Sequence, residues 1–188
     1  GVLAFRGYNA DVSFYSKGES REVVAEAPAG ELWDVVRGIG GKNGYWYADT
    51  LWRLRGLIDR LLGGRGIQAA RPQENTLREG DTLDFWRVLE VDAPRHLQLL
   101  SEMRAPGDAL LDFTIVPLGE KRCELRLTSR FLPRGLAGIL YWYAFYVFHH
   151  VIFRGMLAGI LRAAGAPPTR GPERWQPPEK DACFLPKH

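Results

Sequence analysis

The stretch from Gly135 to Gly165 constrains the fold of this chain more than any other part of the sequence. Prolines stand just before and just after it, and they bracket a predicted helix of roughly 29 to 31 residues, about 45 Å long. Its apolar side chains run almost all the way round, and no charged residue lies between Arg134 and Arg154. Such a helix buries one face in its own domain, and its other face must also be hidden from water.

The composition is that of an ordinary globular protein. A length of 188 residues, with 46% hydrophobic and 25% charged residues, favours one domain with a substantial core. The net charge of +3 comes from scattered arginines rather than from a dense basic run, so we expect no nucleic-acid partner. The two cysteines, Cys123 and Cys183, have neither the spacing of a disulfide framework nor that of a zinc site. They favour a reducing compartment, and we predict a cytoplasmic protein.

Two helices are predicted in the first third of the chain. A strand over residues 20–27 leads into a helix from about residue 29 to residue 37, which a run of glycines ends. Three aromatic residues, Tyr45, Trp46 and Tyr47, then precede an amphipathic helix. Its apolar residues recur at helical spacing at Leu51, Leu54, Leu57, Ile58, Leu61 and Leu62. The aromatic segment either forms a lid with glycine hinges over a binding site, or fills the edge of the core.

From Gly80 the apolar pattern changes to a period of two, which is typical of strands. Residues 82–91 predict one strand, with Leu83, Phe85, Arg87, Leu89 and Val91 on its apolar face. Three further strand faces follow at roughly 12-residue spacing, separated by turn residues. They consist of Leu97, Leu99, Ser101 and Met103, then Ala109, Leu111, Phe113 and Ile115, then Cys123, Leu125, Leu127, Ser129 and Phe131. This spacing indicates an antiparallel meander.

The order of the elements predicts an α+β fold. A curved antiparallel sheet with one apolar face needs a cover, and the last helix is the only predicted element long enough to lie across it. A sheet wrapped round a long C-terminal helix, with a cavity between them, is a helix-grip fold. We assign residues 20–165 to this ligand-binding domain. Residues 1–19 are then an N-terminal extension with a short strand, and residues 166–188 a Pro-rich irregular tail.

Several local sequences together resemble a known family. They are GGKNGYWYADTLWRLRGLIDRLLGG from residue 40, FWRV at 85–88, EMRAPG at 102–107, RFLPRGL at 130–136 and HHVIFRGM at 149–156. Over about residues 11 to 165 the chain resembles an uncharacterised bacterial domain that often follows an atypical short-chain dehydrogenase-like NAD(P)-binding domain. That domain is similar to the START-like, polyketide-cyclase superfamily (SRPBCC), whose members hold apolar ligands between sheet and helix. The resemblance implies a helix-grip fold and a dehydrogenase-like partner, but no defined activity.

A binding site is predicted between the apolar face of the sheet and the long helix, because small-molecule sites combine apolar walls with a few polar anchors. Arg87 is the most informative anchor, since strand alternation directs its guanidinium to the apolar side, where an unpaired charge is costly. Arg87 either holds a polar head of a ligand, pairs with Glu102 or Asp84, or reaches solvent at the sheet end. The predicted ligand-binding residues are Tyr45, Tyr47, Phe85, Arg87, Leu99, Met103, Phe113, Leu127, Trp142, Tyr146, His149 and Phe153.

His149 is the leading candidate for acid–base chemistry. If its helix face looks into the cavity, His149 binds a ligand or acts as a general base; the alternative is a hydrogen-bonded core histidine. His150 points about 100° away, and we expect it on the outer face. Glu102 and Tyr47 are the other catalytic candidates, with a solvated ion pair at the sheet rim as the alternative for Glu102. No metal-ligand spacing is present, so we predict neither a metal nor another cofactor.

We therefore predict a protein that binds a small apolar or amphipathic molecule, and the sequence favours binding over catalysis without deciding between them. An enzyme of the cyclase, dehydratase or hydrolase type, using the same cavity, is the alternative. A third hypothesis is docking through the outer face of the last helix, to a dehydrogenase-like domain, to a second copy in a homodimer, or to a membrane surface. Residues 136–153 form the one transmembrane candidate, about 18 residues long and near the lower limit for a span, so peripheral contact is the expected form of membrane association.

Overall fold

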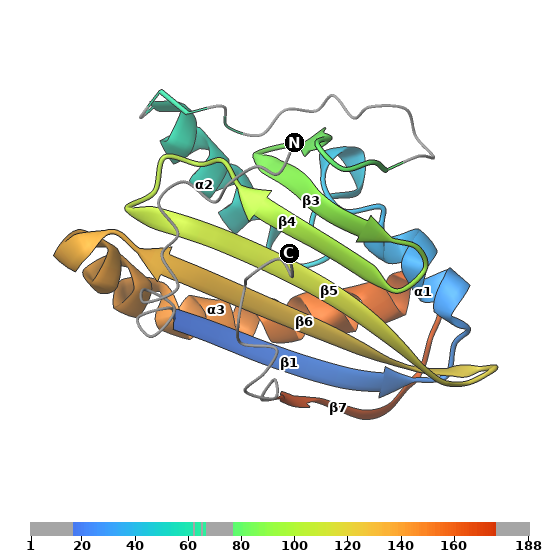
Figure 1. Ribbon diagram of the computed structural model, residues 1–188. Helices are drawn as coiled ribbons and strands as arrows, with labels where there is room; N and C mark the ends of the chain where they lie inside the picture. The colour runs from blue at the N-terminus through green and yellow to red at the C-terminus, as the bar shows by residue number, and fades with distance from the viewer. Residues whose placement is uncertain (1–16, 62, 65, 67–76, 176–188) are drawn as a thin grey trace, which may run out of the picture.

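A computed structural model describes residues 17–61, 63–64, 66 and 77–175. The helices in this part of the chain are α1 (Ala29–Val36), α2 (Asp49–Leu61) and α3 (Gly135–Ala163), and a short 3-10 turn, η2, covers Gly41–Asn43. The strands are β1 (Lys17–Ala25), β2 (Thr82–Leu83), β3 (Trp86–Asp92), β4 (His96–Ser101), β5 (Gly107–Gly119), β6 (Arg122–Pro133) and β7 (Pro168–Arg174). They form one sheet in the order β2-β3-β4-β5-β6-β1-β7, with neighbouring strands antiparallel (Figure 1).

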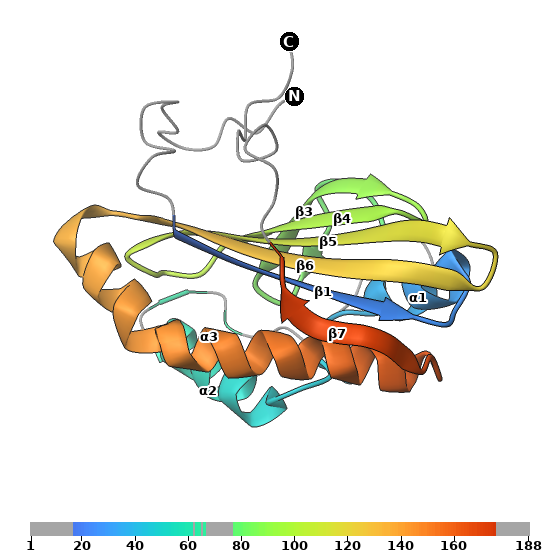
Figure 2. The same cartoon turned by 90° about the horizontal axis from the view of Figure 1, so that it is seen from below.

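The predicted α+β helix-grip fold is confirmed. The sheet is curved, and the three helices lie on one of its faces (Figure 2). The 29-residue α3 runs across this covered face and packs against β1 and β6. The shorter α1 packs against β5 and against α3. A long helix on a curved antiparallel sheet is the element that closes the core.

The covered face of the sheet is apolar because successive strand residues point to opposite sides. Leu99 of β4 lies opposite Leu111 of β5, and Phe113 of β5 lies opposite Leu127 of β6. All four side chains are at most 1% exposed. They form the floor on which the helices and the loop after α1 rest.

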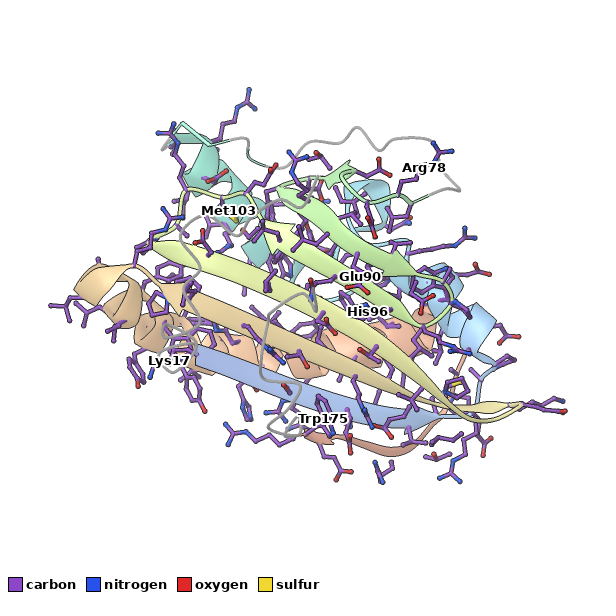
Figure 3. All side chains as sticks on the ribbon, viewed as in Figure 1. Lys17, Arg78, Glu90, His96, Met103 and Trp175 are labelled. Atoms are coloured by element: carbon purple, nitrogen blue, oxygen red, sulfur yellow. The ribbon has the colours of Figure 1, made fainter. Side chains whose placement is uncertain are left out.

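The opposite face of the sheet carries polar and charged pairs. His96 Nε2 lies 2.8 Å from Asp112 Oδ2 on the neighbouring strand, and its Nδ1 lies 3.5 Å from Glu90 Oε1. His96 and Glu90 are labelled on this face in Figure 3. The two faces thus differ in the way expected of an antiparallel sheet covered on one side.

The prediction of a single strand over residues 82–91 is wrong, because the chain reverses direction at Asp84 and Phe85. Asp84 has a left-handed backbone with φ of 55° and lies between β2 and β3. The reversal shifts the alternation in β3 by one residue. Val88 is therefore fully buried on the covered face, whereas Arg87 is half-buried on the opposite side of the strand.

The prediction of an irregular tail is wrong for Pro168–Arg174, which forms β7 along the outer edge of β1. Arg170 donates a 2.8 Å hydrogen bond to the Glu22 carboxylate of β1, which joins the two strands through their side chains as well. Prolines are tolerated in β7 because an edge strand has backbone groups on only one side to pair.

The first strand begins earlier than predicted. β1 starts at Lys17 and so crosses the predicted boundary between residues 19 and 20. Its neighbour β6 continues to Pro133, so Lys17 still has a partner in the ladder, Phe131 of β6. The predicted strand around residues 12–15 and the end of the tail lie outside the described residues.

Candidate functional site

An aromatic–carboxylate cluster, formed by Tyr45, Trp52, Asp84, Phe85 and Trp86, lies where three segments meet. The loop after α1 supplies Tyr45, α2 supplies Trp52, and the β2–β3 turn with the start of β3 supplies the other three. The rings of Tyr45 and Trp52 stack with centroids 4.6 Å apart, and Phe85 lies 6.0 Å from Tyr45 and 5.3 Å from Trp86. Trp52 is half-buried and the other four side chains are buried. The cluster is thus a packed aromatic site around one carboxylate.

The Asp84 carboxylate has one oxygen in use and one open. Its Oδ2 accepts 3.0 Å hydrogen bonds from the Tyr45 hydroxyl and from the backbone N–H of Gly41. Its Oδ1 is buried and has no hydrogen-bond partner. Burial, and next the negative charge of Asp84, raise the pKa of Tyr45, so its hydroxyl stays protonated and donates to the carboxylate.

Two indole N–H groups of the cluster are also open. Nε1 of Trp52 and Nε1 of Trp86 are buried and make no hydrogen bond of regular geometry, although the Trp86 N–H lies near enough to the Tyr45 oxygen to oppose the rise of the Tyr45 pKa. A buried indole N–H usually finds an acceptor, because leaving it unpaired costs about 1–3 kcal/mol. Together with Asp84 Oδ1, the cluster offers two donors and one acceptor to a molecule that could reach them.

The loop between α1 and α2 holds Tyr45 through a strained backbone. Trp46 and Ala48 have φ of 58° and 56°, in the left-handed region that residues other than glycine seldom adopt. At Gly44, with φ of 66°, a Cβ would lie 2.6 Å from the Asp49 carboxylate, which accepts the Tyr45 backbone N–H at 2.8 Å. Backbone strain of this kind persists where the surroundings over-determine it, and it is common at ligand sites.

The same loop packs directly on α3 at two glycines. A Cβ at Gly155 would lie 2.2 Å from the Tyr47 ring, and a Cβ at Gly159 would lie 2.3 Å from the Trp46 carbonyl oxygen. Any larger residue at either position would push the loop away from the helix. The segment predicted as a lid therefore lies against α3, and its opening stays a prediction.

His149 is the polar contribution of α3 to this region. Its ring stacks on Phe153 with centroids 5.6 Å apart and lies 4.9 Å from Trp142. Its Nδ1 is buried without a hydrogen-bond partner. Burial, and secondly the positive charge of Arg55 on α2, lower the pKa of His149 to about 4. The imidazole is therefore neutral at pH 7.

Arg55 connects α2 to α3 and to the segment between β4 and β5. It donates a hydrogen bond to the Tyr141 hydroxyl of α3, and its Nε lies 3.2 Å from Sδ of Met103, which Figure 3 labels beside α2. Of the five buried polar atoms without a partner among the described residues, four belong to Trp52, Asp84, Trp86 and His149. They come from α2, the β2–β3 turn, the first residue of β3 and α3, all on the covered side of the sheet.

Most of the predicted binding residues lie on this covered side. Those that are buried there are Tyr45, Phe85, Leu99, Phe113, Leu127, Trp142 and Phe153. Tyr146 lies at the edge instead, where its hydroxyl accepts a 2.6 Å hydrogen bond from Arg174 of β7. That these residues contact a ligand stays a prediction.

Arg87 does not belong to the cluster. Its Nε donates a 2.5 Å hydrogen bond to Oε1 of Glu102, and its Nη1 donates to the carbonyl of Gly80 at 3.1 Å. The prediction that this guanidinium faces the apolar side is wrong, because the β2–β3 reversal changes the face on which it lies. The alternative, a pair with Glu102, is the arrangement in the structure.

The three predicted catalytic residues have three separate settings. Glu102 pairs with Arg87, Tyr47 covers Gly155, and His149 stacks on Phe153. A catalytic role for His149, Glu102 or Tyr47 stays a prediction. Within the part of the chain that the structure describes, no group of three or more His, Cys, Asp or Glu side chains is placed to hold a metal ion.

Sequence reasoning missed a polar cluster under α3, formed by Glu19, Arg21 and His150. Arg21 donates two hydrogen bonds of 2.9 and 3.0 Å to Oε1 of Glu19, and its Nη2 lies 2.6 Å from Nδ1 of His150. His150 was expected on the outer face; it lies at the edge of α3 instead, with its side chain 43% exposed and its ring against Arg21 of β1. The alternation of β1 could have predicted this cluster. Val23 and Ala25 are buried, and Arg21 and Glu19 share their face of the strand because they lie two and four residues before Val23.

Asp84 was also missed as a site residue. The available signal was a carboxylate between two large apolar residues, Leu83 and Phe85, in an apolar segment. An acidic residue in that position must either turn away or find donors, and here the Tyr45 hydroxyl supplies one.

Comparisons with known proteins give a family and a set of distant structural likenesses. Residues 13–156 match the family described as "Protein of unknown function (DUF2867)". No curated protein matches the chain. Similar solved structures include the Zhui aromatase/cyclase from Streptomyces sp. R1128, with 15% identity over 80% of this chain and 94% of that one, and a TM-score of 0.46.

Two further likenesses are equally distant. Norcoclaurine synthase from Thalictrum flavum has 14% identity over 87% of this chain and 94% of that one, with a TM-score of 0.44. An HSP90 activator from Plasmodium falciparum has 16% identity over 82% and 99%, also with a TM-score of 0.44. Identities and scores this low transfer no activity to this chain.

Proposed function

Since this chain belongs to the DUF2867 family of proteins of unknown function, we propose its function from its own side chains: it binds a small amphipathic molecule at the aromatic–carboxylate cluster. The ligand contacts the rings of Tyr45, Trp52 and Trp86 and lies on the covered side of the sheet. One observation carries the proposal, namely the two indole N–H groups and the Asp84 Oδ1 that are buried without a hydrogen bond of regular geometry. Buried polar groups in folded proteins are nearly always paired, so a bound molecule accounts for three exceptions in one place.

The open groups define the chemistry of the ligand. Two indole N–H donors need an oxygen acceptor such as a carbonyl, and Asp84 Oδ1 needs a donor such as a hydroxyl. The stacked rings of the cluster favour a flat, apolar body. A carboxylate on the ligand would face the charge of Asp84 and be repelled. The fitting class is therefore a neutral aromatic or polycyclic hydroxy-ketone, rather than the acidic ligand that an anchoring Arg87 would have favoured.

Entry of the ligand requires movement of the loop that carries Tyr45. The loop has glycines before its aromatic residues, at positions 40, 41 and 44, and rests on α3 through Tyr47 and Trp46. Release of these two contacts opens a path to the cluster without unfolding the sheet. This is the lid role that the sequence suggested.

The indole N–H signals of the protein in ¹H–¹⁵N spectra test the proposal directly. The six tryptophans give six such signals, and Trp52→Phe and Trp86→Phe each remove one and so assign it. We expect 4-hydroxybenzophenone, which has a carbonyl and a hydroxyl, to shift both signals in a saturable way. The anionic 4-benzoylbenzoate should bind at least tenfold more weakly. Each of the two variants should weaken binding about fivefold, the equivalent of one hydrogen bond of about 1 kcal/mol.

Trp175 is the matched control. It lies beyond β7, with the Arg126 guanidinium 4.5 Å from its ring, on the opposite face of the sheet from the cluster. Its signal should not move, and Trp175→Phe should bind the probe like the unchanged protein. Equal shifts of Trp175 and Trp86, or no shift of Trp52 and Trp86, would overturn the proposal. Native mass spectrometry of the purified protein then identifies any molecule that it carries naturally.

An enzymatic role in the same region is a second candidate, favoured by the neutral imidazole of His149. A general base needs a nitrogen lone pair that is not already hydrogen-bonded. Nδ1 of His149 has no hydrogen-bond partner, and in the tautomer of the neutral ring that carries its proton on Nε2 the Nδ1 lone pair is available. Once a natural ligand is identified, His149→Gln separates the two roles. Loss of turnover with unchanged ligand affinity supports catalysis, and loss of affinity alone supports binding.

A further inference from the structure

Helix α2 presents its apolar side to solvent. Among its described side chains only Gly56 and Asp59 are buried. Its large apolar side chains are 42–79% exposed; they are Leu51, Leu54, Leu57, Ile58 and Leu61. A surface helix of a globular protein normally turns its apolar stripe to the core. The reversed orientation of α2 therefore calls for a partner outside the helix's own domain.

Polar contacts on the other side of α2 fix this orientation. The buried Asp59 carboxylate accepts backbone N–H groups from Gly66 at 2.9 Å and from Arg104 at 2.7 Å. Arg55 binds the Tyr141 hydroxyl of α3. Rotation of the helix to bury its leucines would break all three hydrogen bonds and leave the Asp59 charge unpaired.

The first half of α3 is exposed in the same way. Its apolar side chains that are 40–71% exposed are Leu136, Leu140, Tyr143, Phe145, Val147, Phe148 and Val151. Among the described helices, α3 is long and apolar enough to cross a membrane, yet 33% of its most apolar stretch is buried in the protein. Trp142 and Phe153 hold its other side on the sheet. The helix thus lies flat with one side covered and one side open.

The exposed parts of the two helices form one surface. Arg55 and Tyr141 join α2 to α3, and Phe145 continues from Tyr141 with ring centroids 4.8 Å apart. Phe148 follows at 6.2 Å from Phe145. Both helices lie on the side of the molecule away from the open face of the sheet (Figure 2). We call the exposed apolar residues of α2 and α3 the α2–α3 face.

The exposed charges that the two helices themselves carry are all positive. The exposed charged side chains on the two helices are Arg53, Arg60, Arg154 and Arg162. The carboxylates on the two helices, Asp49 and Asp59, are occupied by backbone N–H groups. An apolar surface bordered by arginines, on two helices that carry no exposed carboxylate, complements a layer of apolar chains under anionic phosphates.

We propose that the α2–α3 face docks on the surface of an anionic lipid bilayer. The leucines of α2 and the aromatic residues of α3 enter the headgroup region, where Tyr143 and the phenylalanines are suited to the interface. The four arginines bind lipid phosphates, for which the guanidinium has matching geometry. The protein lies on the membrane and does not cross it. This inference is independent of the proposed ligand, since none of the open groups of the cluster takes part.

A second copy of the chain fits this face less well. A symmetric dimer places the same patch on both sides of the interface. It would bring the arginines of one copy towards those of the other, and the carboxylates of the two helices, Asp49 and Asp59, already accept backbone N–H groups. A bilayer supplies the missing negative charge.

Flotation of the full chain with vesicles tests the proposal. We expect at least tenfold stronger binding to vesicles of phosphatidylcholine and phosphatidylglycerol at 3:1 than to pure phosphatidylcholine, and a decrease as salt is raised. Leu57→Glu and Val147→Glu, one on each helix, should each reduce binding at least tenfold. Both side chains are exposed, at 55% and 69%, so the variants should fold, and thermal unfolding verifies this.

The controls lie outside the face. Leu118→Glu makes the same change at a 49% exposed leucine of β5 and should leave binding unchanged. The triple change of Arg53, Arg60 and Arg154 to Gln should remove the preference for phosphatidylglycerol. A double change of the exposed Arg78 and Arg95 to Gln, at other sites, should keep it. Both results support the role of the arginines.

Three outcomes would overturn the proposal. One is no binding to either type of vesicle, and another is an equal loss of binding in Leu57→Glu and Leu118→Glu. The third is a dimer in sedimentation analysis that Leu57→Glu converts to a monomer while vesicles bind neither form, which would assign the face to a second copy. The indole signals of Trp52 and Trp86 should respond to the probe equally in Leu57→Glu, so the two proposals can fail separately.

Discussion

The Tyr45 hydroxyl donates a 3.0 Å hydrogen bond to Oδ2 of Asp84, a residue 39 positions further along the chain. The bond ties the strained loop after α1 to the turn between β2 and β3. It also leaves the second oxygen of the same carboxylate open. Much of the proposed site depends on this one pair.

Replacement of Tyr45 by Phe should destabilise the protein by about 1–3 kcal/mol, because it leaves the buried Asp84 oxygen with the Gly41 N–H alone. Urea denaturation measures the change. Tyr143→Phe is the control, since this side chain is 60% exposed and should alter the free energy of unfolding by less than about 0.5 kcal/mol. Equal effects of the two substitutions would show that the Asp84 contact contributes nothing.

Replacement of Gly159 by Ala should destabilise the protein by about 1–3 kcal/mol, although alanine favours a helix over glycine by up to about 1 kcal/mol. The added Cβ would meet the backbone carbonyl of Trp46 at 2.3 Å, and the loop has to move. Gly155→Ala should destabilise the protein as well, because its Cβ would meet Cγ of Tyr47 at 2.2 Å, and rotation of the ring about the Cβ–Cγ bond does not move that atom.

Gly30 provides the control for the glycine substitutions. It lies in α1, and a Cβ there meets nothing within 4 Å. Gly30→Ala should leave stability unchanged or raise it slightly. Thermal unfolding of the three variants gives the order, and a Gly159→Ala protein as stable as Gly30→Ala would contradict the close approach of loop and helix.

His149 should make the protein acid-sensitive. Its pKa in the folded state, about 4, lies below the value of 6.5 in the unfolded chain. The unfolded state therefore takes up the proton first, and stability falls as the pH drops from about 6.5 towards 4, by about 3 kcal/mol at most. His149→Gln removes this contribution. Urea denaturation at pH 7 and pH 4.5 should show a smaller loss for the variant, and identical losses would contradict a buried neutral imidazole.

His96 should have the opposite dependence on pH. A hydrogen bond to Asp112 raises the pKa of His96 above its unfolded value of 6.5, although burial opposes the shift. The stabilisation is complete below about pH 6.5 and is lost as the pH rises through the folded-state pKa. His96→Gln should therefore cost about 0.5–1 kcal/mol at pH 5.5 and less at pH 8.5. An equal cost at both values would mean that the protonated pair does not form.

The fold was predictable because its strongest signals are local. The length of α3 follows from the prolines that bracket it and from its unbroken apolar content, and both can be read from neighbouring residues. The alternation in β4, β5 and β6 likewise predicted which side chains are buried, including Leu99, Phe113 and Leu127. These periods depend only on backbone geometry, which is the same in every strand or helix.

The candidate site was predictable only in part. Tyr45 was identified from the aromatic cluster after the glycines and Phe85 from the alternation of the predicted strand, and both side chains are buried. The role of Asp84 was not, because its position depends on a left-handed turn that one residue of the segment adopts. The same turn moved Arg87 from the covered face to a pair with Glu102.

The sequence by itself determined the elements of this protein: their lengths, their periods, and the presence of more apolar helix surface than one sheet can cover. Only the tertiary structure decided which residues of β3 face the core, that β7 pairs at the edge of the sheet, and that the apolar side of α2 faces solvent. The reason is that a period specifies which residues share a face but not where that face points. For α2 the direction is fixed by Asp59, whose partners Gly66 and Arg104 are brought to it only by the fold.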